Sequence, residues 1–212
     1  HMIEEATTRL WYQPETETFS WKALESTDFG TDDMLAAFTI VYMLSRKRHL
    51  RELPYFVKAK LSNWDVSDRF VEGFKCLQSL MRLPYWNRIW IVQEIVLSPV
   101  ATVVFGSMTA PWKMFAEASE SFMEHIFSCC NSDVPSLPHE CSETLGDFYH
   151  AVLQKEDIRT QRLAQKTVDL IGLLWRYLPR EATDVRDKAY ALLGLVNEWY
   201  DGNPLLPDYT LP

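Results

Sequence analysis

The stretch from Trp86 to Gly106 reads WNRIWIVQEIVLSPVATVVFG and contains the two kinds of secondary structure that decide the fold. Residues 86–97 do not alternate strictly between apolar and polar positions, and their length favours a helix that the following Ser-Pro pair ends. Residues 101–105, short and β-branched before a glycine, are the best strand candidate in the chain. Because apolar residues elsewhere recur mainly at helical spacing, we predict a mainly α fold, α+β at most, with bundle-like packing and one or two short strands around 101–106.

Further helices are predicted over residues 31–48, 68–81, 109–127, 142–154, 165–178 and 185–200. The first of these is apolar nearly all round and should lie at the centre of the core. In 165–178, the residues that fall in register and should face inward are Val168, Ile171, Leu174, Trp175 and Leu178. The strand exposes unpaired backbone groups, so it needs a partner. A second short strand around 107–108, the N-terminal arm or a sheet upstream would supply one.

Composition and charge exclude several classes of protein. The 212 residues are 47% hydrophobic and 24% charged, which excludes disorder over most of the length. Only 7 glycines argue against a glycine-rich nucleotide-binding loop and a turn-dense β-sandwich. The net charge of -8 argues against a protein that grips nucleic acid, and we interpret the basic run 46–51 as a solvated helix end. The longest apolar run, 34–44, is too short to span a membrane. With 4 cysteines and no secretory signal, we expect a cytoplasmic protein without a disulfide framework.

Glu94 is the first candidate for chemistry. It lies among apolar residues, so we expect a partly desolvated carboxylate with a raised pKa, suited to acid–base work or to stabilising an oxocarbenium ion. Trp90 lies one helical turn earlier and would stack beside it, and Arg88 could pair with it. The alternative is that Glu94 makes only a structural ion pair or caps a backbone group.

Potential metal ligands gather between residues 125 and 141. They are His125, Cys129, Cys130, His139 and Cys141. His125 and Cys129 are one helical turn apart and could face a common ion, with His139 and Cys141 closing a tetrahedron. The spacing is not a known zinc pattern, and buried or idle thiols are the alternative. We therefore assign no metal site from the sequence.

The segment 184–188 precedes the last predicted helix, and Thr183 or Asp184 is expected to cap that helix. Acidic residues at a helix start interact favourably with its dipole. Arg186 and Asp187 could form a fixed pair that orients the helix, and the alternative is a simple cap with a solvated first turn.

Two segments together resemble a known family. Residues 83–94, LPYWNRIWIVQE, resemble the last block of the fungal heterokaryon-incompatibility (HET) domain, which reads roughly Arg-Pro-Trp-Phe, then an arginine, a tryptophan and Val-Gln-Glu. Residues 184–195, DVRDKAYALLGL, resemble the stretch Asp-Pro-Arg-Asp-Lys-x-Tyr-Ala-Leu-Leu-Gly-Leu that follows that domain, and residues 207–209 fit the continuation. The first two blocks of the family have no counterpart here. Two such motifs in the right order are fairly specific.

The resemblance implies an organisation of the chain. From the residues themselves, we expect 1–30 to form an irregular aromatic arm, His1-Met2 to be a cloning scar, and the chain to be a fragment of a longer protein. Residues 31–112 would be the C-terminal part of a HET-like domain, and 113–212 a helical post-HET region. The parent HET domain would be a TIR-like α/β fold. The candidate binding residues in the two motifs are Trp86, Arg88, Trp90, Gln93, Arg186 and Asp187.

The resemblance also implies a function in fungal nonself recognition and regulated cell death. We expect an interaction and effector module that contacts a protein partner or the upstream HET segment, with a homo-oligomer as a further alternative. TIR enzymes cleave NAD with a glutamate that follows a tryptophan by four residues, and Trp90 and Glu94 match that spacing. The enzyme alternative is therefore a NAD glycohydrolase in the full-length parent, with Glu94 as its catalytic carboxylate. We expect the fragment itself to be inactive and to hold no cofactor.

Overall fold

The computed structural model describes residues 31–53, 67–106, 108–199 and 202–210, so the predicted arm at 1–30 lies outside it. The chain divides into two compact units. Unit 1 comprises residues 1–81 and 100–150, and unit 2 comprises 82–99 and 151–212. The units do not follow the sequential segments 31–112 and 113–212, which rest on the family resemblance and stay a prediction.

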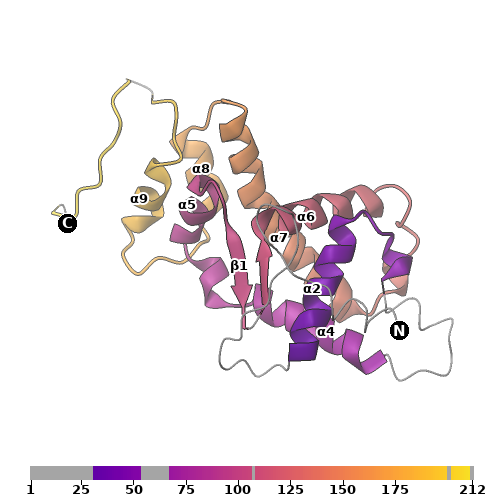
Figure 1. Cartoon of the computed structure of the whole chain (residues 1–212). Coiled ribbons are helices and arrows are strands. Elements are labelled where there is room, and N and C mark those ends of the chain that lie inside the picture. Colours follow the sequence, from indigo (N-terminus) through magenta and orange to yellow (C-terminus); the bar gives the residue numbers. More distant parts are fainter. Residues whose placement is uncertain (1–30, 54–66, 107, 200–201, 211–212) are drawn as a thin grey trace. The chain divides into compact units, whose positions relative to one another are not determined.

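The fold class is confirmed: the described residues are mainly helical with a single two-stranded sheet (Figure 1). None of the described helices combines the length and apolar character that crossing a membrane requires. The α-helices are α2 (Thr31–Ser45), α4 (Ser67–Met81), α5 (Trp90–Leu97), α6 (Trp112–Ile126), α7 (His139–Leu163), α8 (Leu170–Tyr177) and α9 (Asp187–Leu193). The 3-10 turns are η1 (Leu50–Glu52), η2 (Pro84–Asn87) and η3 (Val134–Ser136), and the strands are β1 (Thr102–Phe105) and β2 (Met108–Pro111).

Helix α2 lies at the centre of unit 1, as its apolar sequence predicts. It packs against α4, α6 and β2. The ring of Phe38 in α2 lies edge to face with that of Phe115 in α6, with 5.8 Å between the ring centroids. The ring centroids of Phe115 and Phe148 of α7 are 5.7 Å apart. The solvated helix end predicted at 46–51 is confirmed for Arg46, Lys47 and Arg48, which are exposed, but not for His49, which is half-buried.

The strand finds its partner locally. β1 and β2 pair antiparallel, with Val103 opposite Ala110, and Gly106 in the connecting turn has a left-handed φ of 57°. The prediction that residues 109–111 open a helix is therefore wrong. Their backbone groups pair with β1 instead, and α6 begins at Trp112 after an extended Pro111.

Unit 2 is built from α5, α8, α9 and the part of α7 that begins at Ala151. α5 packs against η2 and α9, and α9 packs against α8. The helix predicted over 86–97 starts later, at Trp90, because Pro84 opens a separate 3-10 turn that ends at Asn87. α7 extends further than predicted, to Leu163, and a left-handed Gln165 with φ 53° separates it from α8.

The inward face predicted for 165–178 is largely wrong. Leu173 and Tyr177 are the buried side chains of α8, and the Tyr177 hydroxyl donates to the Gln154 carbonyl at 2.6 Å. The exposed fractions of Ile171, Trp175 and Leu178 are 68%, 78% and 52%. The helix carries two apolar stripes, and periodicity alone does not say which one is buried.

Helices α2 and α4 approach each other closely at Gly73, and this contact generates a test. A Cβ added at Gly73 would lie 2.7 Å from the Ala36 Cβ and 3.1 Å from the Ala36 carbonyl carbon. Because backbone must shift to make room, we expect Gly73→Ala to lower the free energy of unfolding by about 1–3 kcal/mol in urea denaturation, although alanine has the higher helix propensity.

Gly146 of α7 supplies the matched control, since a Cβ there meets nothing within 4 Å. Gly146→Ala should raise the free energy of unfolding by roughly 0.5–1 kcal/mol through helix propensity. Equal effects of the two substitutions would contradict close packing at Gly73.

Candidate functional site

The two motif segments meet in unit 2 where α5 and α9 begin. Trp90 is the first residue of α5 and Asp187 the first of α9. The Trp90 indole Nε1 donates a hydrogen bond to Asp187 Oδ2 at 3.1 Å, across 97 positions of sequence. Tertiary packing therefore joins the two segments that carry the resemblance.

The second carboxylate oxygen of Asp187 is also occupied. The Tyr209 hydroxyl donates to Asp187 Oδ1 at 2.6 Å, and this hydrogen bond is the main reason that the pKa of Tyr209 is raised to about 12. The Tyr209 ring lies edge to face with Tyr190 of α9 at 5.1 Å, and the Tyr190 hydroxyl donates to the Asp208 carbonyl at 2.8 Å. These contacts attach the described segment 202–210 to α9.

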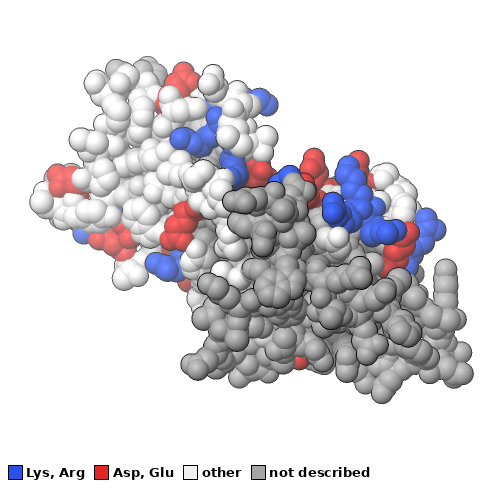
Figure 2. All heavy atoms as spheres, viewed as in Figure 1, with Lys and Arg blue, Asp and Glu red and all other residues white. Residues whose placement is uncertain are grey.

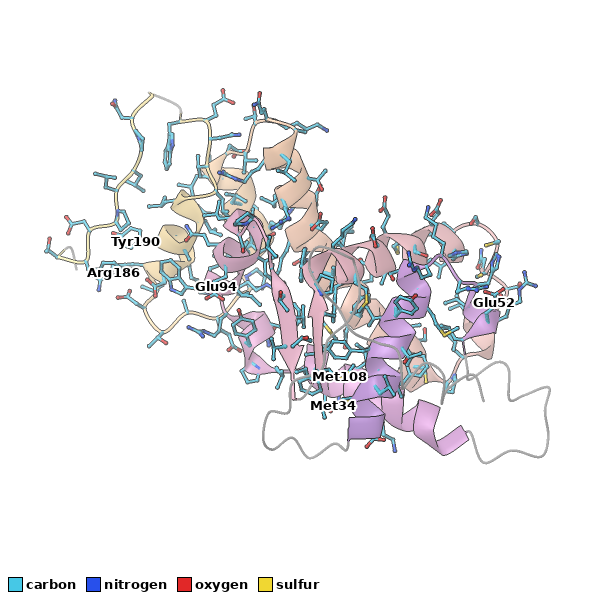
Figure 3. All side chains as sticks on the ribbon, in the orientation of Figure 1. Met34, Glu52, Glu94, Met108, Arg186 and Tyr190 are labelled. Atoms are coloured by element: carbon cyan, nitrogen blue, oxygen red, sulfur yellow. The ribbon has the colours of Figure 1, made fainter. Side chains whose placement is uncertain are left out.

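Arg186 forms its ion pair with Asp184, whereas the sequence suggested Asp187. Its Nε donates to Asp184 Oδ1 at 3.0 Å and Nη2 to Oδ2 at 2.7 Å, and the Arg186 backbone N–H donates to Oδ1 at 2.9 Å. These bonds lower the pKa of Asp184. The guanidinium also lies 5.3 Å from the ring centroid of Tyr209. The Asp184 side chain thus stabilises the turn before α9. Figure 3 shows Arg186 and Tyr190 at that helix.

Glu94 does not match its predicted environment, because it lies exposed on the surface of α5 (Figure 3). The expectation of a desolvated carboxylate is therefore wrong: α5 buries Ile91, Val92 and Ile95, which lie on its other faces. Glu94 accepts a hydrogen bond from the Tyr85 hydroxyl rather than pairing with Arg88, which is itself exposed. Burial and this bond raise the pKa of Tyr85 to about 12, so the phenol stays protonated and donates to Glu94. Such a carboxylate is open to solvent and held in one orientation.

Gln93 lies at the α5–α9 junction, close to a glycine of the second motif. A Cβ added at Gly194 would lie only 2.6 Å from the Gln93 Nε2. The glycine therefore lets the half-buried Gln93 side chain reach α9. Trp90, Gln93, Arg186 and Asp187 all lie at this junction of the two motifs. Arg88 instead lies opposite Glu181 in an isolated β-bridge, whose hydrogen bonds its neighbours Asn87 and Ile89 make.

Trp86 is buried and contacts a group that the sequence analysis missed. The Lys155 Nζ lies 5.3 Å from the Trp86 ring centroid and donates to the Ala151 carbonyl at 2.7 Å. Burial, with a smaller effect of Arg180, lowers the pKa of Lys155 to about 7. The signal in the sequence was its position between Val152 and Ile158, three residues from each, on the buried stripe of α7.

The potential metal ligands of unit 1 come together differently from the prediction. His125, Cys129 and Cys130 gather with His49, a residue of the predicted solvated run 46–51. Neither His139 nor Cys141 belongs to this group in the described part of the chain. A hydrogen bond with His125 is the main reason that the pKa of Cys129 is lowered, whereas burial raises the pKa of Cys130, with a smaller effect of Asp133.

Comparison with models of known protein families, with curated proteins and with solved structures finds no match. The resemblance to the HET family therefore stays a prediction that rests on the motif residues.

The Asp187 hydrogen bonds generate a stability test. Asp187→Ala leaves the Trp90 indole N–H and the Tyr209 hydroxyl without their acceptor, and we expect a loss of about 1–3 kcal/mol in the free energy of unfolding. A double-mutant cycle of Asp187→Ala with Trp90→Phe, measured in urea, should give a coupling energy of at least 0.5 kcal/mol on the scale of about 0.5–3 kcal/mol seen for contacting residues. Additive effects would show that the bond contributes nothing.

The buried Lys155 generates a pH test. Its folded-state pKa of about 7 lies below the ordinary value of 10.5, so between these pH values the unfolded chain holds one more proton than the folded chain. The free energy of unfolding should therefore rise with pH across that window, by up to about 3–5 kcal/mol.

Lys155→Met removes the titrating group and keeps the side-chain volume. The variant should be more stable than the parent chain at pH 6, and the difference should shrink as the pH rises towards 10. A difference that stays constant between pH 6 and 10 would contradict a neutral buried lysine.

Proposed function

We propose that this chain is an interaction and effector module of HET type, which acts in fungal nonself recognition that leads to regulated cell death. The observation that carries the proposal is the hydrogen bond between Trp90 and Asp187. If the two motifs belong to one family domain, their shared residues should support each other, and this bond supports that expectation.

An exposed apolar face on α8 supports the interaction role. Ile171, Trp175 and Leu178 recur at helical spacing and are all exposed. Figure 2 shows that uncharged surface predominates over unit 2 in this view, with separate acidic and basic patches. A stripe with an exposed tryptophan at its centre is typical of a contact surface rather than of ordinary solvated helix.

The partner that fits is a second protein with an apolar surface and a basic rim. The net charge of -8 disfavours association of the chain with its own copies and favours a partner of opposite charge. Association of the chain with itself is then an outcome that the test must detect.

The second candidate is the TIR-like NAD glycohydrolase. The observation that favours it is the solvent-accessible Glu94 carboxylate, held by Tyr85 one helical turn after Trp90. In that reaction the bond between the ribose C1′ and the nicotinamide nitrogen breaks, and Glu94 stabilises the positive charge at C1′. Water then adds to C1′ and loses a proton, which gives ADP-ribose and free nicotinamide.

Expression of the full chain in a filamentous fungus tests the interaction role. Viability is measured by exclusion of a membrane-impermeant dye. We expect the unsubstituted chain to kill cells. Trp175→Ser should abolish killing at unchanged protein level and unchanged unfolding temperature, because the substitution removes the centre of the contact surface. Phe127→Ser is the matched control, since Phe127 is 77% exposed on unit 1, and it should still kill.

The enzyme alternative concerns the full-length parent, so it is separated by Glu94→Gln and by nicotinamide release from NAD in the purified full-length protein as well as in this chain. Killing that survives Glu94→Gln but not Trp175→Ser supports the interaction module. Killing and nicotinamide release that are lost together in Glu94→Gln support the enzyme. Killing that depends on neither residue, or a folded chain that does not kill, contradicts the proposed function. Light scattering reports whether the Trp175 surface joins copies of the chain instead.

A further inference from the structure

Four side chains of unit 1 converge at the ends of α2 and α6. His125 lies in the last turn of α6, Cys129 and Cys130 follow it, and His49 lies in the loop after α2. One ligand atom from each lies within 4.8 Å of every other. His125 and Cys130 are buried, His49 is half-buried and Cys129 is exposed. This cluster takes no part in the motif junction of unit 2.

Three distances in the cluster, all of which involve Cys130 Sγ, are close to those of a tetrahedral metal site. Zinc bond lengths place two sulfur ligands about 3.8 Å apart and a sulfur and a nitrogen about 3.6 Å apart. The Sγ atoms of Cys129 and Cys130 are 3.7 Å apart. Cys130 Sγ lies 3.7 Å from the Nδ1 of His125 and 3.5 Å from the Nδ1 of His49. Cys129 Sγ lies 3.0 and 3.3 Å from the same two nitrogens.

The surroundings orient one histidine as a ligand. His125 Nε2 lies 3.1 Å from the Lys47 carbonyl oxygen, which can only accept a hydrogen bond. Nε2 therefore carries a proton, and Nδ1 is the nitrogen that faces the two sulfur atoms. A backbone carbonyl on the second nitrogen is the usual support of a metal-bound histidine.

The backbone around Lys47 is shaped for this contact. Lys47 has a left-handed φ of 55°, and its N–H donates to the Leu44 carbonyl while the N–H of Arg48 donates to Met43. These two hydrogen bonds form the Schellman motif at the C-terminal end of α2, and Lys47 occupies the left-handed position that is usually a glycine. The turn directs the Lys47 carbonyl towards His125 and brings His49 to the cluster.

We propose that His49, His125, Cys129 and Cys130 bind one zinc ion as a structural site. Two thiolates and two imidazoles form a closed set of four protein ligands, which is typical of structural rather than catalytic zinc. The ion replaces the two thiol protons, and its charge is balanced by the two thiolates. It fastens the loop after α2 to the end of α6, beside the exposed ion pair of Lys47 and Glu124 and the contact of His125 with the Lys47 carbonyl.

One buried carboxylate oxygen, that of the half-buried Asp133, agrees with a cation near the cluster. The backbone N–H of Asp133 donates to the Cys130 carbonyl at 2.9 Å. One oxygen of the Asp133 side chain is buried and, within the described residues, has no hydrogen-bond partner. A nearby positive charge would offset the free-energy cost of burying that oxygen.

The test uses the full chain, freed of any histidine tag and purified under reducing conditions without chelator. Elemental analysis should find about one zinc per chain. After removal of the zinc, cobalt(II) should bind in its place and give the visible absorption spectrum of tetrahedral cobalt with thiolate-to-cobalt charge-transfer bands. His49→Ala and Cys130→Ser should each weaken cobalt binding at least tenfold.

His139→Ala and Cys141→Ala are the matched controls, because these residues lie close in sequence and outside the cluster. Both should keep the metal and the spectrum. If the ligand variants do not fold, zinc removal from the parent chain gives the second readout, and it should lower the unfolding temperature reversibly. Three results would each overturn the proposal: less than a tenth of an equivalent of zinc, a cobalt spectrum without thiolate bands, or a Cys129–Cys130 disulfide in protein that was purified under reducing conditions.

Discussion

The carboxylate of Asp187 is the constraint on which unit 2 depends. Its two oxygens accept from Trp90 at the start of α5 and from Tyr209 in the tail, so one side chain fixes three segments. A carboxylate at the first turn of α9 also interacts favourably with the helix dipole. Because Arg186 is paired with Asp184, the charge of Asp187 remains available to the indole and the phenol. The geometry of the motif junction therefore follows from the order Asp-x-Arg-Asp in the chain.

Unit 1 is held by a different kind of contact. Gly73 allows α4 to approach the backbone of α2 at Ala36, and the aromatic rings of Phe38, Phe115 and Phe148 join α2 to α6 and α7. This packing is apolar and short in range. It leaves the far ends of α2 and α6 to be joined by polar groups, and there the histidine and cysteine side chains meet.

The exposed positions of Glu94 and of the α8 stripe separate the two functional hypotheses physically. Glu94 belongs to α5, whereas Ile171 and Trp175 belong to α8 and Leu178 follows its last residue, and α9 packs against both helices. A contact surface needs exposed apolar area, which α8 has. A glycosidase carboxylate needs orientation and access to substrate, which Tyr85 and the exposed surface of α5 provide. Substitutions in one helix can thus be made without removing the groups of the other.

The sequence alone determined the helical class, the central place of α2 and the short strand, because these depend on local periodicity and on β-branched runs. Tertiary structure decided which face of α8 is buried. Both of its stripes are apolar, and packing in unit 2 buries the one that contains Leu173 and Tyr177. It also decided that Glu94 is exposed, although the apolar residues around it in the sequence predict burial. It likewise decided that Lys155 is buried, although a charged side chain is expected at the surface. His49 lies far from Cys129 in sequence, and only the turn at Lys47 and the packing of α2 on α6 bring the two together. Spacing along a chain reports the neighbours on one element, whereas a site assembled from several elements exists only once they are packed.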